Sequence, residues 1–237
     1  MNTVKRAIII AAGIGIRMQP LTNVVPKPMV EVNGVSMIET IIQALLQNGI
    51  VEIHVVVGHL KEHFLPLQDK YNVDIIENPY YDFCNNISSL YCAREYLDEV
   101  IIMDGDQIIK NPEILHKEFD LSGYSVVYKK ECKNEWFLTV GDDGVIQNCY
   151  KYGGENGYQL YSVSRWNHED GQKLRKYLEL EFEVNKDIDI FWDEVAMFKH
   201  FEDFKLGIYE MNEEDILEID TLEDLMTIDH TYKEIFE

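Results

Sequence analysis

Basic residues are scarce in this chain. Lysine and arginine number 21 against 43 aspartates and glutamates, which gives a formal net charge of −22 at pH 7. Such a charge repels phosphate backbones, and no basic stretch interleaved with aromatic residues counters it, so we expect no nucleic-acid partner. The few cations close to a glycine-rich turn, Arg17 and Lys27, become candidates for holding a small anionic substrate.

Long apolar runs are missing as well. No stretch approaches the roughly 20 apolar residues of a membrane span, and the first residues lack an apolar segment of signal-peptide length. We therefore expect no membrane span and a cytoplasmic location. The cysteines show no C-x-x-C spacing and no histidine in zinc-site register, which favours reduced structural thiols; they are Cys84, Cys92, Cys132 and Cys149.

The first half of the chain alternates strand-like and helix-like segments. Strands are expected at 6–12, 51–57, 73–76 and 100–103, and helices at about 36–48, 61–70 and 87–97. This alternation predicts an α/β fold with a doubly wound, mostly parallel sheet of Rossmann-like type, covered by helices on both faces.

The second half is richer in β-forming residues. Turns are expected at 141–144 and 153–154, amphipathic stretches at 169–182 and 193–203, and a last helix from about Thr221, which Asp224 would cap. We expect a smaller β-rich lobe that forms one wall of a site, within a single domain over residues 1–237.

Two of the expected strands end in residues suited to phosphate and metal. The first strand breaks into Gly13-Ile14-Gly15, and the apolar run 100–103 leads into Asp104-Gly105-Asp106. The carboxyl ends of parallel strands share one edge of a sheet, and a small-residue turn lets backbone N–H groups approach a phosphate. The two segments together predict a site for a metal-complexed nucleotide, with Asp106 as the better ligand and Asp104 as a supporting acid.

Familiar nucleotide motifs are absent. Met18 stands where a dinucleotide fingerprint needs its third glycine, and no Gly-Lys-Ser/Thr of a P-loop follows the turn. No Ser/His/Asp or Cys/His signature is present either. This absence agrees with a reaction that requires no nucleophile on the enzyme.

The segment Ala11–Thr22, followed by Pro26-Lys27-Pro28-Met29, resembles the signature A-A-G-x-G-x-R-x-x-P-x-T with x-K-P-x. It is found in the nucleotidyltransferases that activate phosphorylated sugars and alcohols. The resemblance covers nearly the whole chain, since Asp106 and Asp220 stand where that family places its metal aspartates. Segments around 85–91, 132–137 and 191–193 are most similar to the CTP:phosphocholine cytidylyltransferases.

The resemblance implies a nucleotide-binding part over about 1–120 and an acceptor-binding part over about 121–237. It implies catalysis by Arg17, Lys27, Asp106 and Asp220, and Mg²⁺ bound by Asp106 and Asp220. Nucleotide contacts are expected from Ala11, Ala12, Gly13, Gly15, Arg17, Lys27, Gly58, Asn85, Asn86 and Asp104. Acceptor contacts are expected from Tyr91, Lys129, Glu135, Trp136, Trp192 and Asp193.

The expected acceptor residues Trp192 and Lys129 have specific chemical properties. A quaternary ammonium is recognised by aromatic faces and carboxylates, so Trp192 beside Asp193 is the best candidate for the acceptor site. Lys129 stands where an arginine is expected, which keeps a cation but loses a bidentate fork. Plainer roles exist for other residues: Asn86 and Asp220 would each serve as helix caps.

The implied reaction is transfer of CMP from CTP to phosphocholine, giving CDP-choline and pyrophosphate. Two rivals use the same chemistry on 2-aminoethylphosphonate or on a sugar 1-phosphate. A rival of another class is a non-catalytic nucleotide-sensing module. The preference for CTP over UTP depends on the resemblance alone, and the sequence leaves the oligomeric state open.

Overall fold

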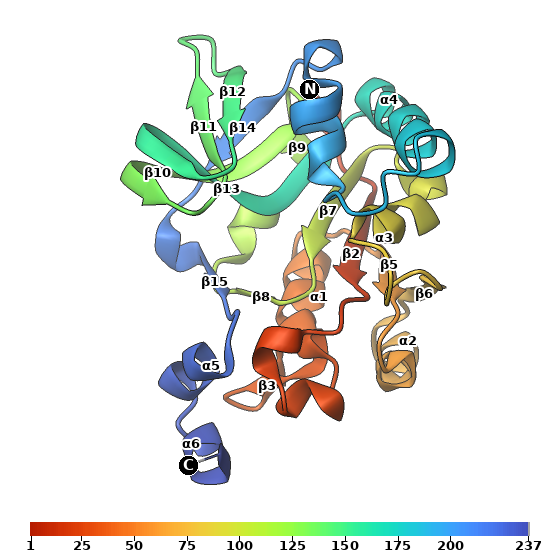
Figure 1. Ribbon diagram of the computed structural model, residues 1–237, viewed down its shortest axis with the longest axis vertical. Helices are drawn as coiled ribbons and strands as arrows, with labels where there is room; N and C mark the ends of the chain where they lie inside the picture. Colours follow the sequence, from red (N-terminus) through yellow and green to blue (C-terminus); the bar gives the residue numbers. More distant parts are fainter. Residues whose placement is uncertain (237) are drawn as a thin grey trace.

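Apolar, β-branched runs form the four parallel strands at the centre of the sheet (Figure 1). The computed structural model of the chain describes residues 1–236. The strands are β2 (Arg6–Ala11), β5 (Glu52–Val57), β6 (Asp74–Glu77) and β7 (Val100–Asp104), in the spatial order β7-β2-β5-β6. Every pairing among them is parallel, as the alternating pattern predicted.

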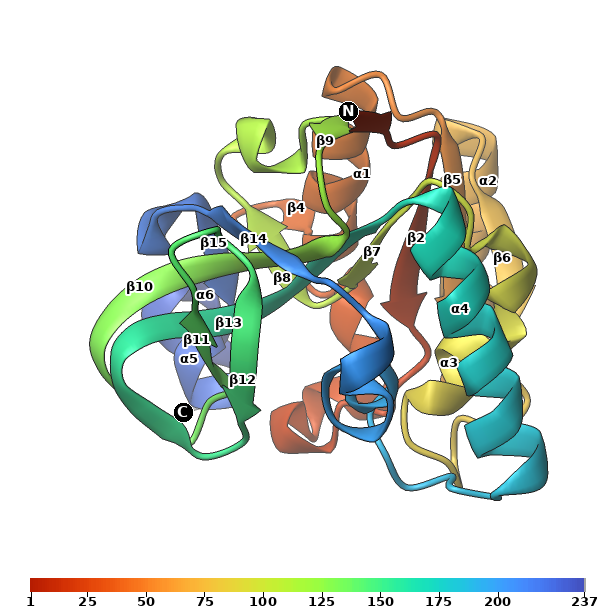
Figure 2. The same cartoon turned by 90° about the horizontal axis from the view of Figure 1, so that it is seen from above.

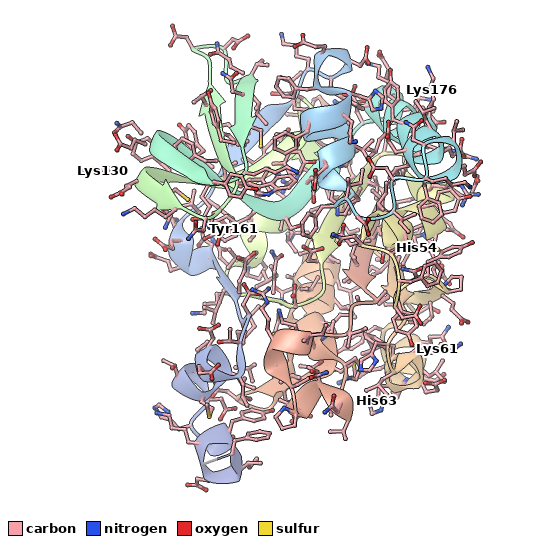
Figure 3. All side chains as sticks on the ribbon, viewed as in Figure 1. His54, Lys61, His63, Lys130, Tyr161 and Lys176 are labelled. Carbon is pink, nitrogen blue, oxygen red and sulfur yellow. The ribbon has the colours of Figure 1, made fainter. Side chains whose placement is uncertain are left out.

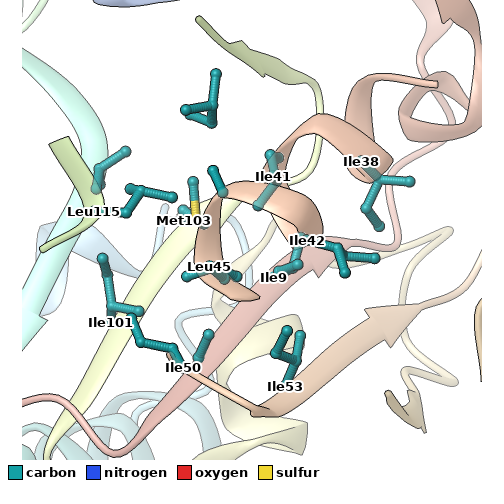
Figure 4. Close-up of a cluster of buried hydrophobic side chains, with 14 of the residues drawn as sticks. Ile9, Ile38, Ile41, Ile42, Leu45, Ile50, Ile53, Ile101, Met103 and Leu115 are labelled. Carbon is teal, nitrogen blue, oxygen red and sulfur yellow. The ribbon is translucent and has the colours of Figure 1, made fainter. Parts of the chain in front are cut away.

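Alternation along β2 divides the core into two layers. Ile9 packs into the cluster under α1 (Met37–Gln47) and α2 (Leu65–Tyr71), where Ile41 and Leu45 meet Ile101 and Met103 (Figure 4). Ile8 and Ile10 point to the opposite face, toward α3 (Ile87–Cys92) and α4 (His168–Glu179). Helices thus cover both faces of the sheet, which confirms the doubly wound prediction.

The β-rich lobe is continuous with this sheet. The long strand β13 (Gly153–Trp166) pairs antiparallel with β7 and with β10 (Gly123–Lys133), and both long strands curve away from the sheet (Figure 2). β11 (Phe137–Val140) and β12 (Ile146–Tyr150) extend the sheet beyond β13, and β14 (Gly207–Glu210) pairs with β10. The same sheet therefore runs through both halves of the chain.

Several turns, strands and helices begin or end at residues other than those predicted from the sequence. The hairpin turn at 141–144 is confirmed, with Gly144 N–H donating to the Gly141 carbonyl at 2.9 Å. Gly153 and Gly154, expected as a turn, instead begin β13, and the turn lies at 151–152. The helix expected over 87–97 breaks into α3 and a 3₁₀ turn at Arg94–Tyr96, and the stretch 193–203 forms π-helical and 3₁₀ turns.

The last part of the chain returns to the strand ends. β15 (Ile216–Glu218) pairs antiparallel with β8 (Gln107–Ile109), with Glu218 opposite Gln107. α5 (Leu222–Ile228) begins in a capping box between Thr221 and Asp224, as predicted, and α6 (Thr231–Phe236) follows. Two short ladders complete the fold: β1 (Asn2–Thr3) with β9 (Glu118–Phe119), and β3 (Glu31–Val32) with β4 (Val35–Ser36).

The structure contains no membrane-spanning helix within residues 1–236, since none of the helices there combines the necessary length and apolar character. Cys84, Cys92, Cys132 and Cys149 are all free thiols. The labelled basic side chains Lys61, Lys130 and Lys176 lie on three separate parts of the periphery (Figure 3).

Gly171 allows α4 to pack against the chain beyond α3. A Cβ atom at this position would lie 2.0 Å from the Leu97 carbonyl oxygen. Gly→Ala in a helix normally stabilises by about 1 kcal/mol, but here the clash with backbone should destabilise by about 1–3 kcal/mol. Urea denaturation of Gly171→Ala measures this, with the exposed Gln172→Ala as control; a Gly171→Ala variant as stable as the parent would contradict the tight approach.

Candidate active site

A cavity of 640 Å³ opens beyond the carboxyl ends of β2 and β7. Both halves of the chain line it, so the β-rich lobe does form one wall. The structure brings together fourteen of the side chains or turn residues singled out from the sequence: Ala11, Ala12, Gly13, Gly15, Arg17, Lys27, Asn85, Asn86, Asp104, Asp106, Glu135, Trp136, Asp193 and Asp220.

Gly15 shapes the turn that follows β2. Its φ of 69° lies in the left-handed region, and a Cβ atom there would lie 3.0 Å from the Lys27 Cβ and 3.1 Å from the Thr22 Cγ2. The Thr22 hydroxyl donates to the Gly15 carbonyl at 2.8 Å. The glycine thus lets the following segment fold back under the turn, which carries Lys27 to the strand ends.

A network of four charged groups lies at the mouth of the turn. Lys27 Nζ is 2.6 Å from Asp106 Oδ2 and 3.1 Å from Asp220 Oδ1, and Arg17 Nη2 is 2.7 Å from the same Asp220 oxygen. Burial lowers the pKa of Lys27, but the two carboxylates outweigh it and raise that pKa above its ordinary value. The ammonium is therefore charged, and two cations balance two anions.

Two further acids lie beneath this network. Burial, then repulsion from Asp106, raises the pKa of Asp104 well above its ordinary value. Burial also raises the pKa of Glu218 to about 7, although Gln107 Nε2 donates to Glu218 Oε1 at 2.8 Å. Sequence reasoning missed Glu218; its position two residues before Asp220 on an extended segment was the available signal, since alternate residues face the same side.

Asp106 and Asp220 suit a shared divalent cation. Their oxygens lie on either side of one ammonium group, so a metal ion could take a similar position between them. Within residues 1–236 no group of three or more His, Cys, Asp or Glu side chains forms a complete metal site. The pair therefore fits a hard cation that keeps water and substrate oxygens as its other ligands.

Another part of the cavity lining consists of Trp136 and Phe191 together with Asp193, and we call these three residues the aromatic wall. The Trp136 and Phe191 rings lie 6.2 Å apart, edge to face at 88°, and Phe198 supports Trp136 from behind at 5.1 Å. Asp193 is 6% exposed, and burial raises the pKa of its carboxyl to about 7. Phe191 was not among the predicted site residues, although its segment was.

Trp192 corrects one expectation. Its side chain is fully buried and packs against Tyr124 and Trp166, with ring centroids 6.4 and 6.3 Å away, so it lies in the core and not on the cavity wall. The physical reason is the alternation of Phe191, Trp192 and Asp193: its two neighbours face the cavity, and the largest side chain fills the space behind them.

Three other predicted residues are not among those that line the cavity in the described part of the chain: Tyr91, Lys129 and Gly58. Tyr91 donates to Glu183 and stacks on Phe182 at 4.3 Å. Lys129 pairs with Glu213 at 2.6 Å.

Gly58 acts indirectly. A Cβ atom at this position would lie 2.6 Å from the Tyr81 side chain, and Tyr81 itself lines the cavity. The glycine thus makes room for a cavity residue that sequence reasoning did not identify.

Comparison with known proteins defines the class. Residues 7–168 match the family model described as the MobA-like NTP transferase domain, and the chain belongs to this family. It is a nucleotidyltransferase, which removes the non-catalytic sensor from consideration. Members of the family commonly use a divalent metal ion.

Two relatives and one solved structure narrow the comparison. The 2-aminoethylphosphonate cytidylyltransferase of Lancefieldella rimae is 35% identical, over 95% of this chain and 92% of its own length. The choline-phosphate cytidylyltransferase of Streptococcus pneumoniae is 33% identical, over 96% and 98%. A solved structure of the CTP:phosphocholine cytidylyltransferase from S. pneumoniae superposes with a TM-score of 0.88 at 32% identity, covering 99% of this chain and 100% of that one.

The raised pKa of Asp193 predicts a pH-dependent stability. The folded protein holds this proton more tightly than the unfolded chain, so stability falls as pH rises from the ordinary value of 3.8 toward about 7 and then levels off. Asp193→Asn removes the buried charge. Its gain in unfolding free energy over the parent should be larger at pH 8 than at pH 5, by on the order of 2 kcal/mol. Equal differences at the two pH values in urea titrations would show that the carboxyl is not destabilised by burial.

Proposed function

We propose that this nucleotidyltransferase transfers CMP from CTP to phosphocholine, giving CDP-choline and pyrophosphate. The observation that carries the choice of acceptor is the aromatic wall, in which the edge-to-face pair of Trp136 and Phe191 lines the same cavity as Asp193. A trimethylammonium group donates no hydrogen bonds, so aromatic faces and a carboxylate are its natural partners. The choline-phosphate cytidylyltransferase of S. pneumoniae, matched both in sequence and in its solved structure, supports the same acceptor.

The nucleotide would lie on the side of the glycine turn. Ala11, Ala12 and Gly13 line the cavity where β2 ends, and nothing lies within 4 Å of the position a Gly13 Cβ would take. Small residues at this edge let a triphosphate approach the backbone closely. Arg17 and Lys27 would then exchange their carboxylate partners for phosphate oxygens.

Asp106 and Asp220 would hold Mg²⁺ together with the phosphates. When bound, the ion supplies charge neutralisation and alignment for the two anionic substrates. In the displacement, a phosphate oxygen of the acceptor forms a bond to the α-phosphorus while the bond to the bridging oxygen breaks, and pyrophosphate leaves with that electron pair. Lys27 stabilises the charge at the α-phosphate and Arg17 the charge on the departing group.

A second candidate acceptor is 2-aminoethylphosphonate, and one of the similar proteins supports it. The Lancefieldella relative is named for 2-aminoethylphosphonate. A primary ammonium donates three hydrogen bonds and prefers carboxylates, which Glu135 and Asp193 offer on the cavity wall. We place the reaction in the cytoplasm, where reducing conditions suit the four free thiols.

Pyrophosphate release tests these assignments directly. CTP, UTP and ATP are crossed with phosphocholine, 2-aminoethylphosphonate and glucose 1-phosphate, with and without Mg²⁺. We expect turnover with CTP and phosphocholine that disappears when the metal is chelated. Faster turnover of 2-aminoethylphosphonate would assign that acceptor instead. Turnover confined to the sugar phosphate would show that the aromatic wall does not recognise the acceptor.

Trp136→Ala separates the two leading acceptors. Loss of one cation–π partner should raise the KM for phosphocholine about tenfold, in keeping with a contact of about 0.5–2 kcal/mol, and leave the KM for CTP unchanged. Trp136→Phe keeps an aromatic face and should recover most of the loss. If phosphocholine and 2-aminoethylphosphonate suffer equally in steady-state kinetics, Trp136 does not recognise the quaternary ammonium.

A further inference from the structure

The side chains of Asn85 and Asn86 are bonded to the segment that carries the aromatic wall. Trp192 N–H donates to Asn86 Oδ1 at 2.9 Å, and Asn85 Nδ2 donates to the Asp189 carbonyl at 3.0 Å. The Asn85 N–H adds a third bond, to the Ile188 carbonyl at 2.8 Å. Three hydrogen bonds thus join a pair of residues before α3 to a segment about a hundred positions later.

The orientation of both amides follows from their partners. A backbone N–H can only donate, so the Asn86 oxygen must face Trp192; a carbonyl can only accept, so the Asn85 nitrogen must face Asp189. Asn86 stands at the start of α3, yet its side chain makes no capping hydrogen bond there. The Asn85 oxygen accepts from the Asn86 N–H at 2.7 Å. The helix-cap role does not account for the Asn86 side chain.

The segment that these amides contact forms no regular secondary structure. Residues 186–191 belong to no helix or strand, and Phe191 is 46% exposed. Trp192 fixes the far side of the segment by its burial in the core. On the other side, Asn85 and Asn86 contact the segment through the three hydrogen bonds, the last of them at Trp192, between Phe191 and Asp193.

We propose that Asn85 and Asn86 are positioning residues for the acceptor, acting through the 188–193 segment, and not the nucleotide contacts that their place in the sequence suggested. The inference builds on the proposed function, because it takes the aromatic wall as the acceptor side of the cavity. In this role, the two amide groups connect the first half of the chain to the aromatic wall through hydrogen bonds.

Steady-state kinetics separate the two roles. Asn86→Ala removes the acceptor of the Trp192 N–H, so the KM for phosphocholine should rise about fivefold, while the KM for CTP and the kcat at saturating phosphocholine stay within about twofold. A rise in the KM for CTP with an unchanged KM for phosphocholine would overturn the proposal and restore the nucleotide contact.

A matched pair of aspartates sharpens the test. Asn86→Asp keeps an oxygen that can accept from Trp192, whereas Asn85→Asp loses the NH₂ group that donates to Asp189. Both add one negative charge at adjacent positions of the same cavity. We expect Asn86→Asp to recover most of the phosphocholine KM lost in Asn86→Ala, and Asn85→Asp to remain impaired. Equal behaviour of the two aspartates would mean that charge, and not hydrogen bonding, decides the effect.

Hydrogen exchange gives a readout that needs no turnover. In the full-length protein, amides of residues 188–193 should exchange at least fivefold faster in Asn86→Ala than in the parent, and Asn86→Asp should restore protection. Unchanged exchange would refute the proposed contact. If another acceptor replaces phosphocholine in the pyrophosphate assay, the same variants are compared with that acceptor, so failure of the proposed function and failure of this inference are separate results.

Discussion

The active site depends on one ammonium group that satisfies two carboxylates. Lys27 lies between Asp106 and Asp220, and it belongs to neither of the segments that carry them. The paired carboxylates would repel each other without a cation between them, and the buried ammonium would be destabilised without its anions. The arrangement is therefore stable only when all three segments are in place, which couples the glycine turn, β8 and β15 into one unit.

Local geometry prepares each partner for that position. The left-handed conformation of Gly15 brings the Lys27 segment beneath the turn, and the antiparallel pairing of β8 with β15 places Asp220 beside Asp106. In the proposed reaction, both cations would exchange these carboxylate partners for phosphate oxygens. A resting site of this kind avoids isolated buried charges without needing any ligand.

Much of this could be predicted from the sequence. The alternation of apolar strands with amphipathic helices indicated the doubly wound sheet, and the turn glycines with the strand-end aspartates indicated part of the cavity lining. These features are local, so their periodicity or spacing carries the information. The Thr221 capping box is a further example, since donor and acceptor are three residues apart.

The aromatic wall was harder to predict because burial is a tertiary property. Trp192 and Phe191 are adjacent, and the sequence does not reveal which ring faces the cavity; packing against Tyr124 decides it. Glu218 was missed because its raised pKa depends on burial among other acids. The bonds from Asn85 and Asn86 to the 188–192 segment join positions about a hundred residues apart, beyond any local pattern.

The position of Asp220 also has a consequence for synthesis of the protein. It lies 193 residues after Lys27, so a chain emerging from the ribosome can form the glycine turn and the parallel sheet long before the second carboxylate exists. Lys27 then has only Asp106 to pair with, and the site is half assembled. The charged network is complete only when β15 pairs with β8, so it is among the last parts of the structure to form during synthesis.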